Sequence, residues 1–200
     1  MVYMITFDLA NQLGIPKLAD YLYEIDKEME NIVRSASPVI SKPVLRMLKT
    51  HGKQLRPSLV LACALSNGAK FDSKLLSACV AVELVHIASL VHDDIIDDAD
   101  NRWGQPSIYK KEGPTHALLV GDFLFAEACR QGSAISNEAA QLVAKTITTL
   151  CNGQANEMIE NFNPDRTKQS LFSVMADKTA ALLSTSCQLG GLCAKLSAPQ

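Results

Sequence analysis

Apolar residues recur at helical spacing along most of this chain, and no stretch of useful length alternates as a β-strand does. Clusters of Gly, Pro, Asn and Asp separate the periodic stretches. The pattern predicts helices at about residues 17–34, 40–50, 57–67, 74–98, 115–131, 135–161 and 168–196. The first of these carries an apolar stripe, typical of core or dimer packing, at Leu18, Leu22, Ile25, Met29, Ile32 and Val33. The fold class is therefore all-α.

The stretch 75–91 is apolar on nearly every side, which is typical of a helix buried inside a bundle. The polar residues near its end fall on one line. At roughly 100° per residue, His86, Asp93 and Asp97 share a narrow stripe, and Ser89 lies close beside it. We expect this stripe to line a wet cavity.

Carboxylates crowd the end of this helix, where Asp93, Asp94, Asp97 and Asp98 are followed by Asp100. The negative end of the helix dipole disfavours each anion by roughly 0.3–1 kcal/mol, so the cluster needs a counter-cation. The four helical aspartates form two i,i+4 pairs, whose oxygens suit a hard cation. Magnesium fits best, because it takes one or two carboxylates and completes its shell with water and phosphate. Zinc would want more nitrogen or sulfur ligands, and a solvated acidic helix end is the alternative.

A basic motif lies upstream, at Gly52-Lys53-Gln54-Leu55-Arg56-Pro57. Proline suits the first position of a helix and biases the residue before it out of the helical region. We therefore expect Lys53 and Arg56 on a loop that enters a helix N-terminus, where free N–H groups and two cations favour phosphate. Such cations are often merely solvated. Together with the acidic helix end, however, they predict two anion sites, one bridged by magnesium and one held by side chains.

Length and composition limit the remaining possibilities. Two hundred residues with 48% hydrophobic content bury one core, and no linker divides the chain, so we expect one domain over residues 1–200. The net charge of −2 gives no electrostatic case for nucleic acid. The six cysteines lie in apolar helical stretches without CxxC spacing, typical of reduced core residues in a cytoplasmic protein. Since we find no leader and no run of about 18 apolar residues, we expect no stable membrane insertion.

At these motifs the sequence resembles the trans-type isoprenyl diphosphate synthases, the polyprenyl synthetase family. GKQLRP is similar to the family's GKxxRP, and ELVHIASLVHDDIID is similar to its first aspartate-rich DDxxD helix. NRWGQPSIYKKEG is similar to its RRGxPTxHxxxG segment. Further matches in family order are GDFLFA, Gly153-Gln154 and the tetrapeptide DKTA at 177–180. The resemblance runs from about residue 39 to about residue 192, and it implies a single antiparallel helical bundle around a central cavity.

The resemblance also implies roles for individual residues. Asp93 and Asp97 would bind Mg²⁺ ions that bridge an allylic diphosphate, with Asp94 supporting them. The other implied ligands are Arg102 and Lys178 for the same diphosphate, Gln154 and Thr179 lining the allylic site, and Lys53, Arg56 and His86 for isopentenyl diphosphate. The implied reaction is head-to-tail condensation, in which the diphosphate leaves, the isopentenyl double bond attacks the allylic carbocation and a proton is lost. Such catalysis is mostly positioning and electrostatics.

Product length follows from the same resemblance. In the family, a bulky aromatic residue four or five positions before the first aspartate closes the pocket. The corresponding positions here are Ser89 and Ala88, which are both small, so we expect a product longer than farnesyl diphosphate.

The chain departs from the family pattern in two places. Trp103 stands where the second arginine of the RRG segment normally contacts isopentenyl diphosphate. Family members also continue into a second aspartate-rich motif, whereas the aspartates after residue 160 are Asp165 and Asp177 and neither belongs to such a motif. We therefore expect the chain to correspond to the N-terminal two thirds of a synthase, lacking the family's C-terminal helices.

Alternative functions remain open from the sequence. The chain is expected to work as a homodimer or with a partner subunit, and it could be an inactive or partner-dependent diphosphate-binding subunit. A class I terpene cyclase would keep the aspartate-rich motif but would not need Lys53, Arg56 and His86. An HD-type phosphohydrolase would use the histidine–aspartate pair at 92–93, but it leaves GKQLRP and Asp97 unexplained.

Overall fold

The computed structural model describes residues 10–50 and 52–196. Its elements, in chain order, are α2 (Leu18–Arg34), α3 (Pro38–Leu48), α4 (Leu55–Ser66), α5 (Ser73–Ile96), β1 (Asn101–Arg102), β2 (Gln105–Pro106), α6 (Ile108–Glu112), α7 (Pro114–Ile135), α8 (Asn137–Glu160), α9 (Lys168–Met175), η1 (Ala176–Ala180) and α10 (Ala181–Cys193). The all-α prediction is confirmed. Within the described ranges, β-structure is limited to the antiparallel pair of two-residue strands.

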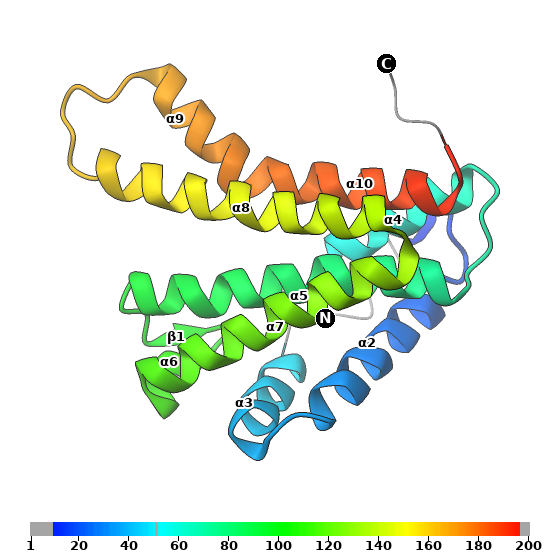
Figure 1. The fold of residues 1–200 in the computed structure, drawn as a ribbon, viewed down its shortest axis with the longest axis horizontal. Helices are drawn as coiled ribbons and strands as arrows, with labels where there is room; N and C mark the ends of the chain where they lie inside the picture. Colours follow the sequence, from blue (N-terminus) through cyan, green and yellow to red (C-terminus); the bar gives the residue numbers. More distant parts are fainter. Residues whose placement is uncertain (1–9, 51, 197–200) are drawn as a thin grey trace.

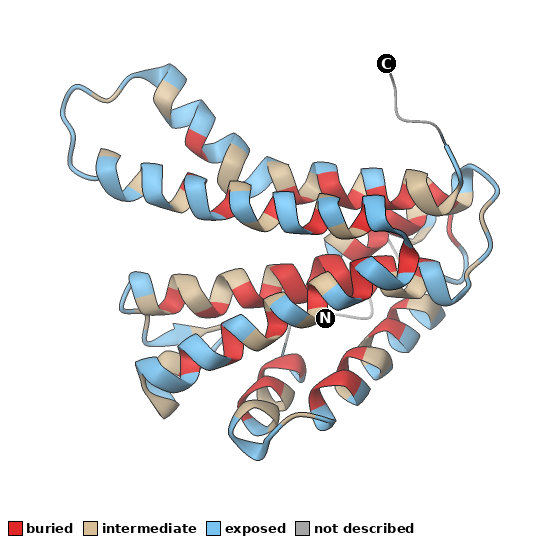
Figure 2. Ribbon diagram, in the orientation of Figure 1, coloured by how far each residue is buried: buried red, intermediate tan, exposed pale blue. Residues whose placement is uncertain are grey.

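Helix α5 runs through the middle of the bundle (Figure 1). It packs along α7 and also contacts α4 and α10, while α8 packs against α7, η1 and α10. Helices α2 and α3 pack against each other and close the bundle beside α5 and α7. Figure 2 shows the buried faces of these helices turned inward, with the far ends of α8 and α9 exposed. One apolar cluster joins buried residues from α2 to α10.

Helix α5 is apolar on all sides because other helices surround it. The side chain of Asp72 caps its start by accepting a hydrogen bond from the Leu75 N–H at 2.9 Å. An 18-residue window of the helix has mean hydropathy 1.8, enough in length and composition to cross a membrane. The expectation that no such run exists was therefore wrong. Because 67% of that window is buried inside the bundle, the run has the character of a core helix.

Helix α4 begins two residues earlier than predicted. Gln54 precedes its first residue with a left-handed backbone, at φ 49°, and the Ser58 N–H makes the first helical hydrogen bond to the Gln54 carbonyl at 3.1 Å. Arg56 therefore lies in the first helical turn, and the prediction that it lies on the preceding loop was wrong. Pro57 is tolerated there because the N–H groups of a first turn have no helical partner.

Two further segments differ from the predicted pattern. The stretch expected as one helix at 168–196 is divided into α9, η1 and α10, with a π-helical turn in the middle. Residues 101–106 form a hairpin whose central residues, Trp103 and Gly104, both have positive φ, at 50° and 77°. Positive φ at both central residues is the requirement of a type I′ two-residue hairpin loop, so local turn geometry determines this backbone.

Candidate active site

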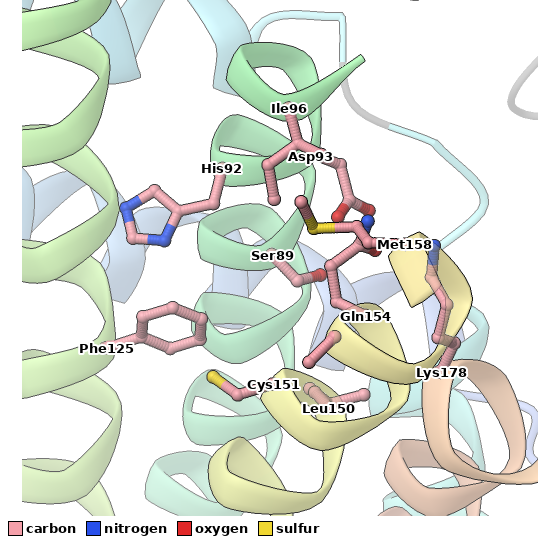
Figure 3. A pocket seen from close by; sticks show the side chains of 11 residues that line it. Ser89, His92, Asp93, Ile96, Phe125, Leu150, Cys151, Gln154, Met158 and Lys178 are labelled. Atoms are coloured by element: carbon pink, nitrogen blue, oxygen red, sulfur yellow. The ribbon is translucent and has the colours of Figure 1, made fainter. Parts of the chain in front are cut away.

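A pocket of about 260 Å³ opens at the C-terminal end of α5, between α7 and α8 (Figure 3). Its lining residues are Ser89, His92, Asp93, Ile96, Phe125, Leu150, Cys151, Gln154, Ala155, Met158 and Lys178. A polar pocket of about 470 Å³ adjoins it and adds Asp97, Glu157 and Asn161. The joint cavity thus has a charged end beside the aspartates and an apolar end between α5, α7 and α8.

Asp93 and Asp97 form one wall of the charged end. They are one turn apart, and the Asp97 N–H closes the last turn on the Asp93 carbonyl at 2.8 Å. Burial raises the pKa of the Asp93 carboxyl, as does the negative charge of Asp97, while Lys178 opposes the rise. A carboxylate whose negative charge is disfavoured by burial and by a neighbouring anion gains from a bound cation.

The opposite wall comes from α8 and η1. Gly153 allows α8 and η1 to pack in direct contact. A Cβ at this position would lie 2.8 Å from the Asp177 Cβ and 3.0 Å from the backbone nitrogen of Lys178. The π-helical turn then presents Lys178 toward the pocket, where its ammonium pairs with Glu157. Figure 3 shows Asp93 directed toward Gln154 and Lys178 across this space. π-Helical turns are often found at functional sites, and this one places a cation opposite the aspartates.

Gln154 lies between the two walls. Its buried Oε1 atom has no hydrogen-bond partner among the described residues. A buried amide oxygen that makes no bond costs free energy, which a donor or a cation in the pocket would recover. Thr179, predicted to line the same site, is exposed and does not contact the pocket.

Asp94 turns away from the pocket and holds Arg102. Its side chain is 2% exposed, and its Oδ1 atom accepts a hydrogen bond from the Arg102 Nε at 3.0 Å and another from a terminal guanidinium nitrogen. Burial raises the pKa of the Asp94 carboxyl although Arg102 opposes the rise. The structure thus brings Asp94 and Arg102 together as an ion pair beneath the site, with Asp94 positioning the arginine.

A second basic region lies at the start of α4. Burial lowers the pKa of Arg56, while Glu83 on α5 counteracts the effect, and the Arg56 Nε is buried without a hydrogen-bond partner in the described structure. The pKa of His86 falls to about 3 because of burial, with Arg56 and Arg102 adding to the fall. A neutral imidazole beside an under-bonded guanidinium makes an environment that favours a bound anion.

The loop before α4 is held by a hydrogen bond at 2.5 Å from the Gln54 side chain to Asp26 on α2. This contact holds Gln54 in its left-handed backbone conformation immediately before α4. Exposed Lys53 precedes Gln54, and Arg56 follows it inside the helix. Lys53 is therefore on the loop, as predicted.

The two residues predicted to control chain length differ in position. Ser89 lines the pocket, and its hydroxyl donates to the His86 carbonyl at 2.8 Å. Ala88 is fully buried and does not line the pocket.

Trp103 is half-buried and packs against the apolar core from the hairpin turn.

No group of three or more His, Cys, Asp and Glu side chains converges as a closed metal centre within residues 10–50 and 52–196. Asp93 and Asp97, with the unpartnered Gln154 oxygen nearby, make an open set of hard oxygen donors instead. Such a set fits a cation that keeps water and phosphate oxygens in its shell, as magnesium does.

Comparison with known proteins identifies the family. The family model for polyprenyl synthetase matches residues 37–200. The chain belongs to the polyprenyl synthetase family. It is 36% identical over 184 residues to heptaprenyl diphosphate synthase component 2 from Geobacillus stearothermophilus, and 32% identical over 186 residues to the protein of that name from Bacillus subtilis. These alignments cover 91% and 92% of this chain but only 57% and 53% of the relatives.

Solved structures share the fold. Heptaprenyl diphosphate synthase from Staphylococcus aureus superimposes with a TM-score of 0.85 at 29% identity, covering 90% of this chain and 57% of that one. Geranylgeranyl pyrophosphate synthase from Lactobacillus brevis gives a TM-score of 0.87 at 27% identity, covering 94% of this chain and 59% of that one. This polyprenyl synthetase family member thus spans little more than half the length of the relatives it matches.

The sequence of this family member did not lead us to predict several residues that belong to the site. Glu157 pairs with Lys178, Glu83 faces Arg56, and Phe125 and His92 line the apolar end. The His92 ring fits against Gly121, where a Cβ would lie 2.1 Å from its Nε2, and that nitrogen lies 3.2 Å from the Leu118 carbonyl oxygen. The helical glycine in GDFLFA was a usable signal for this close packing, whereas nothing in the local sequence marks the glutamates.

Proposed function

We propose that this chain forms the diphosphate-binding part of a prenyltransferase that condenses isopentenyl diphosphate with an allylic diphosphate to make a linear polyprenyl diphosphate. One observation supports this most strongly: Asp93 and Asp97 face Lys178 across a pocket whose other end is apolar. An allylic diphosphate has the same polarity, with a polyanionic head and a hydrocarbon tail. Relatives named heptaprenyl diphosphate synthase component 2 and nonaprenyl diphosphate synthase add support.

The head group is proposed to lie between the aspartates and Lys178, with Mg²⁺ supplied by the medium. Bound Mg²⁺ would stabilise the negative charge that develops on the leaving diphosphate. Lys178 neutralises the same charge from η1, and Arg102 adds a guanidinium whose orientation Asp94 fixes. The Gln154 amide oxygen completes the polar edge of the pocket.

Isopentenyl diphosphate is proposed to bind at Arg56, His86 and Lys53. The under-bonded Arg56 Nε gives this head group a buried donor, and the neutral His86 adds one N–H. The tail of the allylic substrate would extend past Ser89 toward Phe125 and the apolar end. Since Ser89 is small, we propose that the product grows longer than farnesyl diphosphate.

Calorimetry with geranyl diphosphate, with and without Mg²⁺, tests the head-group site. We expect Mg²⁺-dependent binding that Asp93→Ala and Asp97→Ala each abolish. Asp100→Ala is the matched control, because Asp100 belongs to the same acidic stretch but is exposed and paired with Lys110 at 2.6 Å. If both pocket variants bind as the unmodified chain does, the site is assigned wrongly.

A partner-dependent subunit is the second candidate, because the relatives from Geobacillus and Bacillus are named as component 2 of a heptaprenyl diphosphate synthase. Pyrophosphate release separates the candidates. A synthase releases it only with both substrates, a cyclase with the allylic diphosphate alone, and a chain that needs a partner releases none in either mixture while still binding the allylic diphosphate.

A further inference from the structure

Two cysteines on facing helices lie away from the candidate active site. Cys63 is on α4 and Cys187 is on α10, and the two helices pack along each other. Gly190 makes their approach close, because a Cβ at that position would lie 2.6 Å from the Val60 oxygen and 2.8 Å from the Cys63 Cβ. Cys187 is one helical turn before Gly190 and so shares its face. This packing makes Cys63 and Cys187 neighbours, and the influence of Cys187 on the pKa of the Cys63 thiol agrees with that placement.

The pair is accessible from one side. Both cysteines are half-buried, and Cys187 lines a groove of about 710 Å³ between α8 and α10 that includes Glu138, Lys145 and Gln188. A peptide-sized thiol reagent can therefore meet Cys187 first. Burial raises the pKa of the Cys63 thiol to about 11, and the neighbouring Cys187 adds to the rise, so Cys63 rests as the protonated thiol.

The neighbouring thiols are already engaged with the backbone. Cys79 is fully buried and its Sγ lies 3.8 Å from the Pro57 carbonyl oxygen, while the Cys193 Sγ lies 3.8 Å from the Lys74 carbonyl oxygen. Cys63 and Cys187 differ because, among the described residues, neither is held by a backbone carbonyl in this way and both are half-buried, whereas Cys79 has no exposed surface. A disulfide requires neighbouring thiols whose Cβ atoms can come within about 3.5–4.5 Å, and the close approach of α10 to α4 at Gly190 favours this.

We propose that Cys63 and Cys187 form a reversible disulfide that joins α10 to α4 in the presence of a disulfide oxidant such as oxidised glutathione. The Cys187 thiolate attacks one sulfur of the oxidant, forming a mixed disulfide and releasing one glutathione thiolate. The Cys63 thiolate then attacks the Cys187 sulfur, forming the internal disulfide and releasing the second glutathione thiolate. The protein loses two electrons and two protons, and the oxidant gains the two electrons.

The bond would restrain the bundle. It closes a loop that runs from α4 through α5, α7 and α8 to α10, and a disulfide across a long loop removes much of the freedom of the unfolded chain. The cross-linked protein should therefore melt roughly 5–15 °C higher than the reduced protein. This inference does not depend on the proposed prenyltransferase function.

The test uses the purified chain in graded mixtures of reduced and oxidised glutathione at mildly alkaline pH. Free thiols are then blocked with an alkylating reagent, and intact mass and tryptic peptides are measured. We expect a species lighter by two hydrogens, in which the Cys63 peptide is linked to the Cys187 peptide. Cys63→Ser should stop at the mixed disulfide on Cys187, and Cys187→Ser should remove the internal link. The matched control, Cys79→Ser with Cys193→Ser, should still form it.

Each outcome decides the proposal. Linked Cys63 and Cys187 peptides, together with a raised melting temperature that reductant reverses, support it. Glutathione on Cys187 without ring closure overturns it, as does a link that maps to other cysteines. A chain that stays fully reduced where a small exposed dithiol is oxidised also overturns it, and a cross-link that lowers the melting temperature refutes the stabilising role.

Discussion

His86 should make the stability of this protein sensitive to mild acid. Its folded-state pKa is about 3, against an ordinary value of 6.5, so the folded protein keeps the imidazole neutral while the unfolded chain protonates it. The stability that the neutral His86 contributes is fully present at pH values above its ordinary pKa of 6.5, and it is lost as the pH falls toward its folded-state pKa of about 3. Each pH unit below 6.5 costs about 1.4 kcal/mol, so about 2 kcal/mol is lost by pH 5.

Urea unfolding of the unmodified chain and of His86→Gln, at matched pH values, measures this loss. Carboxylates titrate in both proteins, so the difference between the two slopes isolates the imidazole. We expect the variant to lose about 2 kcal/mol less than the unmodified chain between pH 6.5 and 5. His116→Gln is the matched control for the substitution itself, because His116 is exposed on α7. Equal slopes for His86→Gln and the unmodified chain would refute the reasoning.

The same residue should report on ligand binding. The positive charges of Arg56 and Arg102 help to lower the pKa of His86. A negatively charged diphosphate bound beside them should raise that pKa again. Binding of isopentenyl diphosphate near pH 6 should therefore take up protons. Calorimetry in two buffers of different ionisation enthalpy measures this uptake, which should disappear in His86→Gln.

Three other changes have expected outcomes. Arg102→Met leaves the Asp94 carboxylate buried without its partner and should lower the free energy of unfolding by about 3–5 kcal/mol, and adding Asp94→Asn should recover part of that loss; an unchanged denaturation midpoint would contradict the ion pair. Gly153→Ala should cost about 1–3 kcal/mol in thermal unfolding, because its Cβ would lie 2.8 Å from a neighbouring side chain, whereas Gly191→Ala, with its nearest contact at 3.9 Å, should cost less. Trp103→Arg should tighten isopentenyl diphosphate binding by about ten- to hundred-fold in calorimetry, and weaker binding would show that the tryptophan acts through packing.

The local sequence determined the helices and one wall of the site. A helix with apolar residues on every side must be buried, so α5 could be recognised from its composition alone. The i,i+4 spacing of Asp93 and Asp97 places their side chains on one face regardless of what surrounds them. The family motifs were equally readable, because each is a short run of neighbouring residues.

Tertiary structure decided which groups meet. Asp93 and Asp94 are adjacent in sequence, yet Asp93 faces the pocket and Asp94 pairs with Arg102. Successive helical residues point about 100° apart, so the two side chains leave the helix in different directions. Which of them meets a pocket and which meets an arginine depends on the elements packed around α5. Lys178 reaches the cavity while neighbouring Thr179 is exposed, since the π-helical turn and the contact at Gly153 set the rotation of η1.

The long-range pairs were beyond the sequence for the same reason. Cys63 and Cys187 are far apart along the chain, and their proximity depends on how closely α10 approaches α4 at Gly190. The depressed pKa of His86 also depends on burial and on two arginines from other elements. Periodicity fixes what one helix presents, whereas close packing between helices fixes distances and desolvation, and these set the chemistry of the site.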